Sequence, residues 1–204
     1  MLDADFFRRW MTATAASVAR EADRLTDLDS PIGDADHGAN LQRGFTAVTA
    51  TLEKEAPDTP GAVLMLAGRT LISTVGGASG PLYGTLLRRT GKALGDAAEV
   101  SEEEFALALR TGVEAVMTLG GAVPGDKTMI DALVPAVDAL PDGFAAARAA
   151  AEEGAVATTP LQAHKGRASY LGERSIGHQD PGATSSSLLI AALQEAASAE
   201  ATGE

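Results

Sequence analysis

The sequence predicts an all-α protein of eight antiparallel helices that forms a single domain over residues 1–204. Apolar residues recur at intervals of three and four in eight successive segments, which is the pattern of helices that bury one face. Alanine is abundant and aromatic residues make up only 4% of the chain, which favours closely packed helices over strands. No segment has a convincing strand pattern, and the short connections favour antiparallel neighbours.

The first four expected helices are separated by acidic, proline-containing and glycine-rich stretches. Helix one covers about residues 5–25, where the apolar side chains form one stripe. Helix two follows an acidic loop and runs to about Lys54. Pro60 marks the start of helix three, because proline is tolerated in the first turn of a helix. Helix three ends at the glycine-rich residues 76–81, and helix four begins with Leu82.

The last four expected helices have similarly clear boundaries. Residues 101–104 have the pattern of a capping box, which opens helix five. The glycine-rich residues 120–128 end this helix and precede helix six. A tight turn at 140–143 leads to helix seven over about residues 144–157. A long irregular stretch, 158–181, then leads to helix eight, which closes the chain.

The connections between the helices sort into two chemical kinds. If the helices alternate up and down, the odd-numbered connections lie together at one end. The connections at that end carry an acidic loop, two glycine-rich loops and the long irregular stretch. The even-numbered connections, at the opposite end, are plain turns. This sorting predicts a functional site in the loops at one rim.

Three aspartates, Asp29, Asp34 and Asp36, fall within eight residues of the first of these rim loops. Pro31 and Gly33 oppose a continuous helix here, and a bend would bring Asp29 round to face the other two. In an extended segment Asp34 and Asp36 project to the same side. Carboxylates that face one point repel one another unless a cation lies between them. Hard oxygen ligands of this kind suit Mg²⁺, Mn²⁺ or Ca²⁺.

The acidic loop leads directly into a helix, whose N-terminal N–H groups favour phosphate. We therefore expect a magnesium site beside a phosphate site. Two plainer interpretations compete with this one. Any single aspartate here is more often a helix cap than a ligand, but capping explains one aspartate and not three. A calcium-binding loop requires glutamate at its twelfth position, where this chain has Phe45.

Charge and composition exclude several functional classes. The formal net charge of -12 argues against nucleic-acid binding, which needs a basic face. The chain has no cysteine, so disulfides, thiolate metal sites and cysteine nucleophiles are excluded. The sequence shows no signal-peptide pattern and no apolar run of membrane-spanning length. We therefore expect a soluble cytoplasmic protein that binds neither nucleic acid nor membrane.

Other rim residues have a functional and a plainer interpretation. Ser79 offers a hydroxyl at a helix start, although glycine-rich stretches of this kind are often only helix ends. Arg167 and Arg174 suit the countering of phosphate charge, although arginines are more often simply exposed. Lys127 is solvated in the plainer interpretation. His37 follows two expected metal ligands and suits a contact to a nucleotide or to those ligands.

Four long motifs together resemble one family, the nucleotide-binding L subunit of bacterial dihydroxyacetone kinase. The resemblance covers essentially the whole chain, with the motifs in the right order. The motifs are IGDADHGAN at 32–40, GGASGPLYG at 76–84, GDKTMIDAL at 125–133 and GRASYLGERSIGHQDPG at 166–182.

This resemblance implies an eight-helix antiparallel up-and-down barrel with ADP or ATP in the loops at one rim. It implies two Mg²⁺ ions held by Asp29, Asp34 and Asp36. It implies a catalytic role for Arg174, which would meet charge on the transferred phosphoryl group. The residues that the resemblance places around the nucleotide are His37, Gly38, Ala39, Asn40, Ala78, Ser79, Gly121, Met129, Arg174, Asp180, Pro181 and Gly182.

The implied reaction transfers a phosphoryl group from the nucleotide to dihydroxyacetone held on a separate K subunit. The resemblance further implies that ADP stays bound and is recharged by a phosphohistidine protein of the phosphoenolpyruvate-dependent phosphotransferase system. Two alternatives remain open at this point. The first is a free-ATP-dependent kinase subunit acting on another small ketose. The second is a nucleotide sensor that binds a transcriptional regulator and catalyses nothing.

Overall fold

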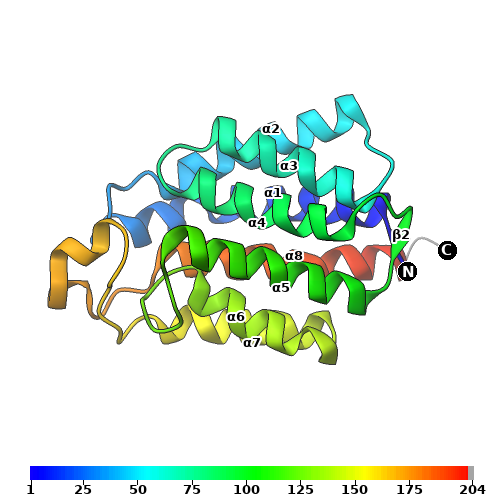
Figure 1. Ribbon diagram of the computed structural model, residues 1–204. Coiled ribbons are helices and arrows are strands. Elements are labelled where there is room, and N and C mark those ends of the chain that lie inside the picture. Colours follow the sequence, from blue (N-terminus) through cyan, green and yellow to red (C-terminus); the bar gives the residue numbers. More distant parts are fainter. Residues whose placement is uncertain (202–204) are drawn as a thin grey trace.

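The structure is a computed structural model that describes residues 1–201. In that part of the chain, eight α-helices run alternately up and down around one core (Figure 1). They are α1 (Ala4–Asp29), α2 (His37–Glu55), α3 (Pro60–Thr74), α4 (Ser79–Leu94), α5 (Glu102–Gly120), α6 (Ile130–Ala139), α7 (Phe144–Ala157) and α8 (Pro181–Ala201). The loops also contain two 3₁₀ helices, η1 (Leu140–Asp142) and η2 (Arg167–Ser175), and two short strands, β1 (Leu2–Asp3) and β2 (Glu99–Val100).

The ring of helices is closed. Each α-helix packs against the next one in the sequence, and α8 packs against both α7 and α1. A buried polar contact joins the two ends of the ring, because Nε1 of Trp10 in α1 donates to the carbonyl oxygen of Leu189 in α8 at 2.8 Å. The prediction of an all-α, eight-helix antiparallel barrel is confirmed. Among the described residues, no helix has the length and apolar character that a bilayer span requires.

Several predicted details are wrong. The first helix begins at Ala4, close to the expected start, where the side chain of Asp3 caps it by accepting the N–H of Phe6 at 2.9 Å, but its end was misplaced. It continues to Asp29, which therefore belongs to a helix end and not to the acidic loop. Helix α4 begins at Ser79 and not at Leu82. The expectation of no strand missed the antiparallel pairing of β1 with β2, two residues each.

Aromatic side chains hold together the end of the barrel at which the odd-numbered helices begin. Phe7 of α1 contacts the rings of Phe6, Trp10 and Phe105. Phe105 of α5 also contacts Trp10, and Phe144 of α7 contacts both Phe6 and Phe105, with all these ring centroids 5.3–6.5 Å apart. Such pairs each contribute about 0.5–1.5 kcal/mol beyond the burial of their area. This end is therefore stabilised independently of the loops at the other end.

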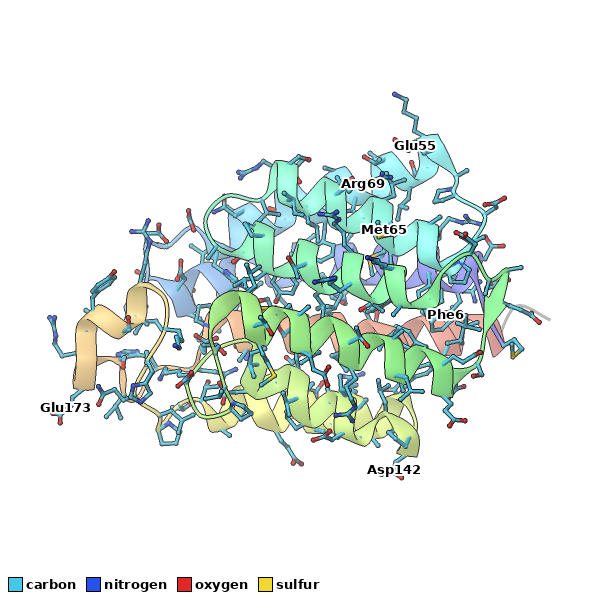
Figure 2. The ribbon with its side chains drawn as sticks, in the orientation of Figure 1. Phe6, Glu55, Met65, Arg69, Asp142 and Glu173 are labelled. Atoms are coloured by element: carbon cyan, nitrogen blue, oxygen red, sulfur yellow. The ribbon has the colours of Figure 1, made fainter. Side chains whose placement is uncertain are left out.

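The four unusual connections lie together at one end of the barrel, as the sorting of the loops predicts. They are residues 30–36, 75–78, 121–129 and 158–180, and Figure 1 shows them at the left, with η2 projecting beyond the helices. Figure 2 labels Glu173 at the outer part of this projection and Glu55 and Asp142 at the opposite end. We call the end that carries these four connections the loop rim.

Candidate functional site

All four even-numbered helices begin at the loop rim. Their first residues, His37, Ser79, Ile130 and Pro181, line one pocket of about 520 Å³. Unpaired backbone N–H groups and the positive ends of the helix dipoles therefore gather around this pocket, which favours an anionic ligand. The gathering follows from the up-and-down order of the chain, because every second helix must start at the same end.

The pocket has an apolar wall and a cationic side. Leu82 of α4, Val116 of α5 and Met129 supply apolar lining. Lys165 and Arg167 supply positive charge from the loop between α7 and α8. A pocket that combines an apolar wall with a few polar groups suits an organic group that carries an anion.

Asp29, Asp34 and Asp36 come together beside this pocket. One carboxylate oxygen from each residue lies within 4.8 Å of the others. Asp29 also ties the end of α1 to the start of α2, because its Oδ2 accepts the N–H of Asp36 at 3.1 Å and that of His37 at 3.3 Å. The structure thus brings together the three residues that the sequence analysis selected as metal ligands. We call them the aspartate cluster.

The surroundings of the aspartate cluster suit a hard divalent cation. A side chain at position 33 would place its Cβ 1.9 Å from Oδ1 of Asp29, so Gly33 leaves that oxygen uncovered. Arg167 reaches over from the loop between α7 and α8, with Nη2 2.9 Å from Oδ2 of Asp34, and offsets part of the negative charge. The donors are carboxylates, which suit Mg²⁺, and not the thiolate or imidazole groups that zinc prefers.

His37 is a buried residue that links the start of α2 to two other helices. Its Nε2 lies 2.8 Å from Oγ of Ser185 in α8, and its Nδ1 lies 3.3 Å from Oγ of Ser79 in α4. Burial lowers the pKa of His37, although the charges of Asp29 and Asp36 oppose this change. In the neutral ring one nitrogen donates and the other accepts, so the two serines fix the orientation of the ring.

Tyr83 extends this hydrogen-bond network into the first turns of α8. Its hydroxyl lies 2.7 Å from Oγ of Ser185 and 2.9 Å from Oγ of Ser186, and it donates to the carbonyl oxygen of Gly182 at 3.3 Å. Burial raises the pKa of Tyr83 to about 12, so its hydroxyl stays protonated. A continuous set of hydrogen bonds therefore runs from the aspartate cluster through His37 to α8.

Asp180 caps α8 at the floor of the pocket. Its Oδ2 accepts the N–H of Ala183 at 2.7 Å, and its own N–H donates to Oγ1 of Thr158 at 2.9 Å. Burial raises the pKa of Asp180 to about 7. The N–H of Ala183 and the charge of Lys127 act in the opposite direction, whereas the charge of Asp131 raises the pKa further.

Lys127 is not solvated, so the plainer interpretation of this residue is wrong. The residue is 1% exposed, and it lines the pocket. Its Nζ donates to the carbonyl oxygens of Thr158 and Leu161 at 3.0 Å and of Ser175 at 2.8 Å. The loop between α7 and α8 wraps around this ammonium group, an arrangement that the local sequence does not encode.

Most of the residues predicted to contact a nucleotide line the pocket. Ala78 and Ser79 lie at the start of α4, Met129 precedes α6, and Asp180 precedes α8. The predicted residues among the pocket lining are His37, Ala78, Ser79, Met129, Asp180, Pro181 and Gly182.

Three other residues predicted to contact a nucleotide are not among those that line the pocket. Gly121 ends α5 in the left-handed region (φ 57°), between two lining residues. Asn40 is buried and its Oδ1 accepts Nη2 of Arg43 at 2.8 Å. Gly38 lets α2 approach α1, since a Cβ there would lie 1.9 Å from the carbonyl oxygen of Ala22.

Two of the residues predicted to contact a nucleotide are exposed. Ala39 lies in the first turn of α2 and faces outward. Arg174 lies on η2, is exposed, and is not among the residues that line the pocket. Arg167, from the same 3₁₀ helix, lies nearer to the aspartate cluster.

The sequence analysis missed Tyr83, Ser185 and Ser186. Tyr83 lies within the glycine-rich motif at 76–84, where it resembles an ordinary core aromatic. The only sequence signal for the serines is the run of four hydroxyl residues at 184–187, which is unusual at buried positions of a helix.

Comparison with known proteins shows the family of the chain. A family model described as the DAK2 domain matches residues 31–195. The chain is 46% identical over 198 residues to the ADP-binding subunit DhaL of the PEP-dependent dihydroxyacetone kinase of Escherichia coli (strain K12), covering 92% of this chain and 94% of that one. It is 38% identical over 181 residues to an L-erythrulose 1-kinase of Mycolicibacterium smegmatis, with 84% of this chain matching 32% of that protein.

Solved structures give the same result. The dihydroxyacetone kinase of C. freundii in its native form superposes with a TM-score of 0.76 at 29% identity, and 93% of this chain matches 34% of that one. The same enzyme in complex with AMP-PNP and Mg²⁺ gives a TM-score of 0.74 at 28% identity, with 92% of this chain matching 33% of that one. The chain therefore belongs to the DAK2 domain family, in the group of L subunits of bacterial dihydroxyacetone kinases.

Proposed function

We propose that this chain is the nucleotide-binding subunit of a dihydroxyacetone kinase and forms a single L-type domain over residues 1–204. It transfers a phosphoryl group from a bound nucleotide to dihydroxyacetone held on a separate K-type subunit. The observation that carries this proposal is the aspartate cluster, whose oxygens lie within 4.8 Å of one another beside a pocket where four helices begin. Relatives named as ADP-binding subunits of such kinases support it.

In this proposal ADP or ATP occupies the pocket, and Asp29, Asp34 and Asp36 hold two Mg²⁺ ions. The donor set and the open space at Gly33 suit such ions. Bound magnesium supplies the positive charge that lets phosphates lie beside three carboxylates. The C. freundii kinase structure in complex with AMP-PNP and Mg²⁺ supports a nucleotide and magnesium as the ligands.

The residues of the chain contribute position and charge. The N-terminal amides of α2 and α4 donate toward the pocket, and Leu82 and Met129 exclude water from one wall. Arg174 meets charge on the transferred group in this proposal, with Arg167 as the nearer of the two arginines to the aspartate cluster. Phosphoryl transfer depends on positioning and charge neutralisation more than on proton transfer, so no general base is assigned to this chain.

The acceptor and the phosphoryl donor both come from partner proteins. We assign the acceptor site to the K-type subunit, and the recharging of bound ADP to a phosphohistidine protein of the phosphotransferase system in the cytoplasm. The names of the relatives, PEP-dependent and PTS-dependent, support this donor. Other relatives are named erythrulose kinases, which favours a second candidate acceptor, a four-carbon ketose, for an alternative partner.

The test is reconstitution of the reaction from purified proteins. The chain is mixed with a K-type subunit, dihydroxyacetone and either a phosphohistidine donor system or ATP, and the phosphorylated product is measured. We expect product with the donor system and much less with ATP. Asp36→Ala should abolish the reaction, whereas Asp58→Ala, an exposed carboxylate at the opposite end, should not change it.

Three outcomes would change the assignment. Equal rates with ATP and the donor system would make the chain an ordinary ATP-dependent subunit. Product from erythrulose but not from dihydroxyacetone would favour the four-carbon acceptor. Nucleotide binding without any phosphoryl transfer would favour a regulatory sensor that contacts a transcriptional regulator.

A further inference from the structure

Lys127 is a buried cation that forms no ion pair among the described residues. Its backbone adopts a φ of 61°, which L-residues rarely adopt, so the surrounding structure holds this residue in place. An ammonium group has three N–H donors, and three carbonyl oxygens lie 2.8–3.0 Å from Nζ. A fourth, that of Thr159, lies at 3.5 Å. Backbone carbonyls therefore accept all three N–H groups of this ammonium.

The carbonyl groups that Lys127 binds come from separate parts of one loop. Thr158 directly follows α7, Leu161 lies one turn later, and Ser175 ends η2. One side chain thus gathers the two ends of an 18-residue segment, 158–175, at a single point. Without the cation, three buried carbonyl oxygens would face one another, and carbonyl dipoles aligned in this way repel.

One further contact joins the same two loops, and another ties the second loop to itself. The N–H of His164 donates to the carbonyl oxygen of Asp126, the residue before Lys127, at 3.1 Å. The N–H of Ala163 donates to Oγ of Ser175 at 2.9 Å. The loop between α5 and α6 and the loop between α7 and α8 therefore behave as one connected unit with Lys127 at its centre.

Both loops form walls of the pocket. Thr128 and Met129 come from the first loop, and residues 165–168 and Asp180 come from the second. Thr158, one of the residues bound by Lys127, also accepts the N–H of Asp180 through its Oγ1 at 2.9 Å. A shift of the second loop would therefore open the pocket on the side of α8.

The barrel itself does not depend on this contact. Helices α7 and α8 pack directly against each other, and η2 projects beyond the helices (Figure 1). The aromatic layer that stabilises the barrel lies at the opposite end. The loss of the Lys127 ammonium should therefore loosen the loop rim far more than the helices.

We propose that Lys127 is a positioning residue that locks these two loops together and thereby sets how slowly the nucleotide leaves the pocket. This inference rests on the proposed function, since it concerns retention of a nucleotide by the same site. It predicts that removing the ammonium group changes dissociation of the nucleotide, while the rate of association changes little.

The test uses Lys127→Met, which keeps the length of the side chain and removes its charge. Dissociation of a fluorescent ADP analogue is followed by stopped flow in the presence of Mg²⁺ and excess unlabelled ADP. We expect dissociation at least about tenfold faster than from the wild-type chain, equivalent to about 1.4 kcal/mol, with association within about twofold. Lys92→Met, at an exposed lysine on α4, is the charge-matched control and should behave as wild type.

A second control separates positioning from general loss of stability. Leu64→Ala removes buried core volume in α3, far from the loop rim, and should lower the melting temperature without speeding dissociation. The chain also allows a rescue, because it contains no cysteine. Lys127→Cys, unfolded, alkylated with 2-bromoethylamine and refolded, regains an ammonium at nearly the original position and should regain slow dissociation.

If Lys127→Met does not fold, Ser175→Ala tests the same connected unit of loops. This variant removes the hydroxyl that accepts the N–H of Ala163, and ADP should dissociate from it faster than from wild type. Wild-type dissociation from a folded Lys127→Met, or from Ser175→Ala if that variant must stand in, would overturn the inference. Equal acceleration in Leu64→Ala would do the same. A wild-type chain that binds no ADP with Mg²⁺ would instead refute the proposed function, and the inference with it.

Discussion

Nε2 of His37 lies 2.8 Å from Oγ of Ser185, a residue 148 positions later in the chain, and this contact joins the starts of two helices. His37 begins α2 directly after the aspartate cluster, and Ser185 lies in the second turn of α8. Tyr83, from α4, binds the same serine oxygen. Three of the four helices that begin at the pocket are thus fixed relative to one another by side chains that carry no net charge.

Tyr83→Phe should weaken ADP binding in Mg²⁺ by about fivefold, which corresponds to the loss of roughly 1 kcal/mol for one hydrogen bond. The ring would still pack against Phe45, so the helices should stay folded. Calorimetric titration with ADP measures the effect. Tyr170→Phe is the control, because Tyr170 is 88% exposed. Identical affinities in both variants would mean that the network does not position His37.

Asp34→Ala and Asp36→Ala should each abolish magnesium-dependent binding of ADP, because phosphates would then meet the remaining carboxylates without a cation. Circular dichroism should show unchanged helices. In the absence of metal and nucleotide, Asp36→Ala should melt no lower than wild type, since it relieves repulsion within the aspartate cluster. Unchanged ADP affinity in magnesium for both variants would show that the cluster is not the metal site.

Asp180 should make the stability of the ligand-free protein depend on pH. Burial raises the pKa of Asp180 from 3.8 in the unfolded chain to about 7 in the folded protein. Between these two pH values the folded protein therefore holds a proton that the unfolded chain has released. The free energy of unfolding therefore falls as pH rises from about 4 to 7. Above pH 7 the loss caused by ionising Asp180 reaches its full value, up to about 4 kcal/mol.

Asp180→Asn keeps an oxygen that can accept the N–H of Ala183 but cannot ionise. Urea unfolding at several pH values should show the variant gaining stability over wild type as pH rises from 4.5 to 7.5. A stability difference that stays constant over this range would mean that Asp180 is ionised throughout.

Arg174→Ala should slow phosphoryl transfer more than it weakens ADP binding, because an arginine that meets developing charge acts mainly in the transition state. Arg167→Ala is the informative comparison, since Arg167 lies 2.9 Å from Asp34 whereas Arg174 is exposed on η2. The rates of phosphoryl transfer and the ADP affinities of the two variants show which arginine has the catalytic role. A larger loss of transfer in Arg167→Ala would move the catalytic role to that residue.

The arrangement of the loop rim was predictable because it follows from the number and order of the helices. Eight helices with short connections must alternate, so the glycine-rich loop before Ser79 and the aspartate cluster had to share one end. The convergence of Asp29, Asp34 and Asp36 was predictable from their spacing around Pro31 and Gly33. The position of Asp29 within a helix was not, because the helix continues past the last residue of its apolar stripe.

The contacts inside the site could not be predicted, because they depend on segments that are distant in the sequence. The sequence alone predicts that Lys127 is an ordinary surface lysine. It is buried because residues 158–175 fold around its side chain. The sequence predicts Tyr83 to be an ordinary core residue. Its hydroxyl has hydrogen-bond partners only because α8 places Ser185 and Ser186 beside it.

We propose that the loop rim retains a magnesium nucleotide. The direct measurement is to purify the protein without added nucleotide, denature it, and assay the supernatant for ADP and magnesium, then to follow exchange of the bound nucleotide with labelled ATP. We predict bound ADP with magnesium, and exchange slower than one catalytic cycle. Protein that emerges empty and binds neither ADP nor ATP in the presence of Mg²⁺ would contradict the claim.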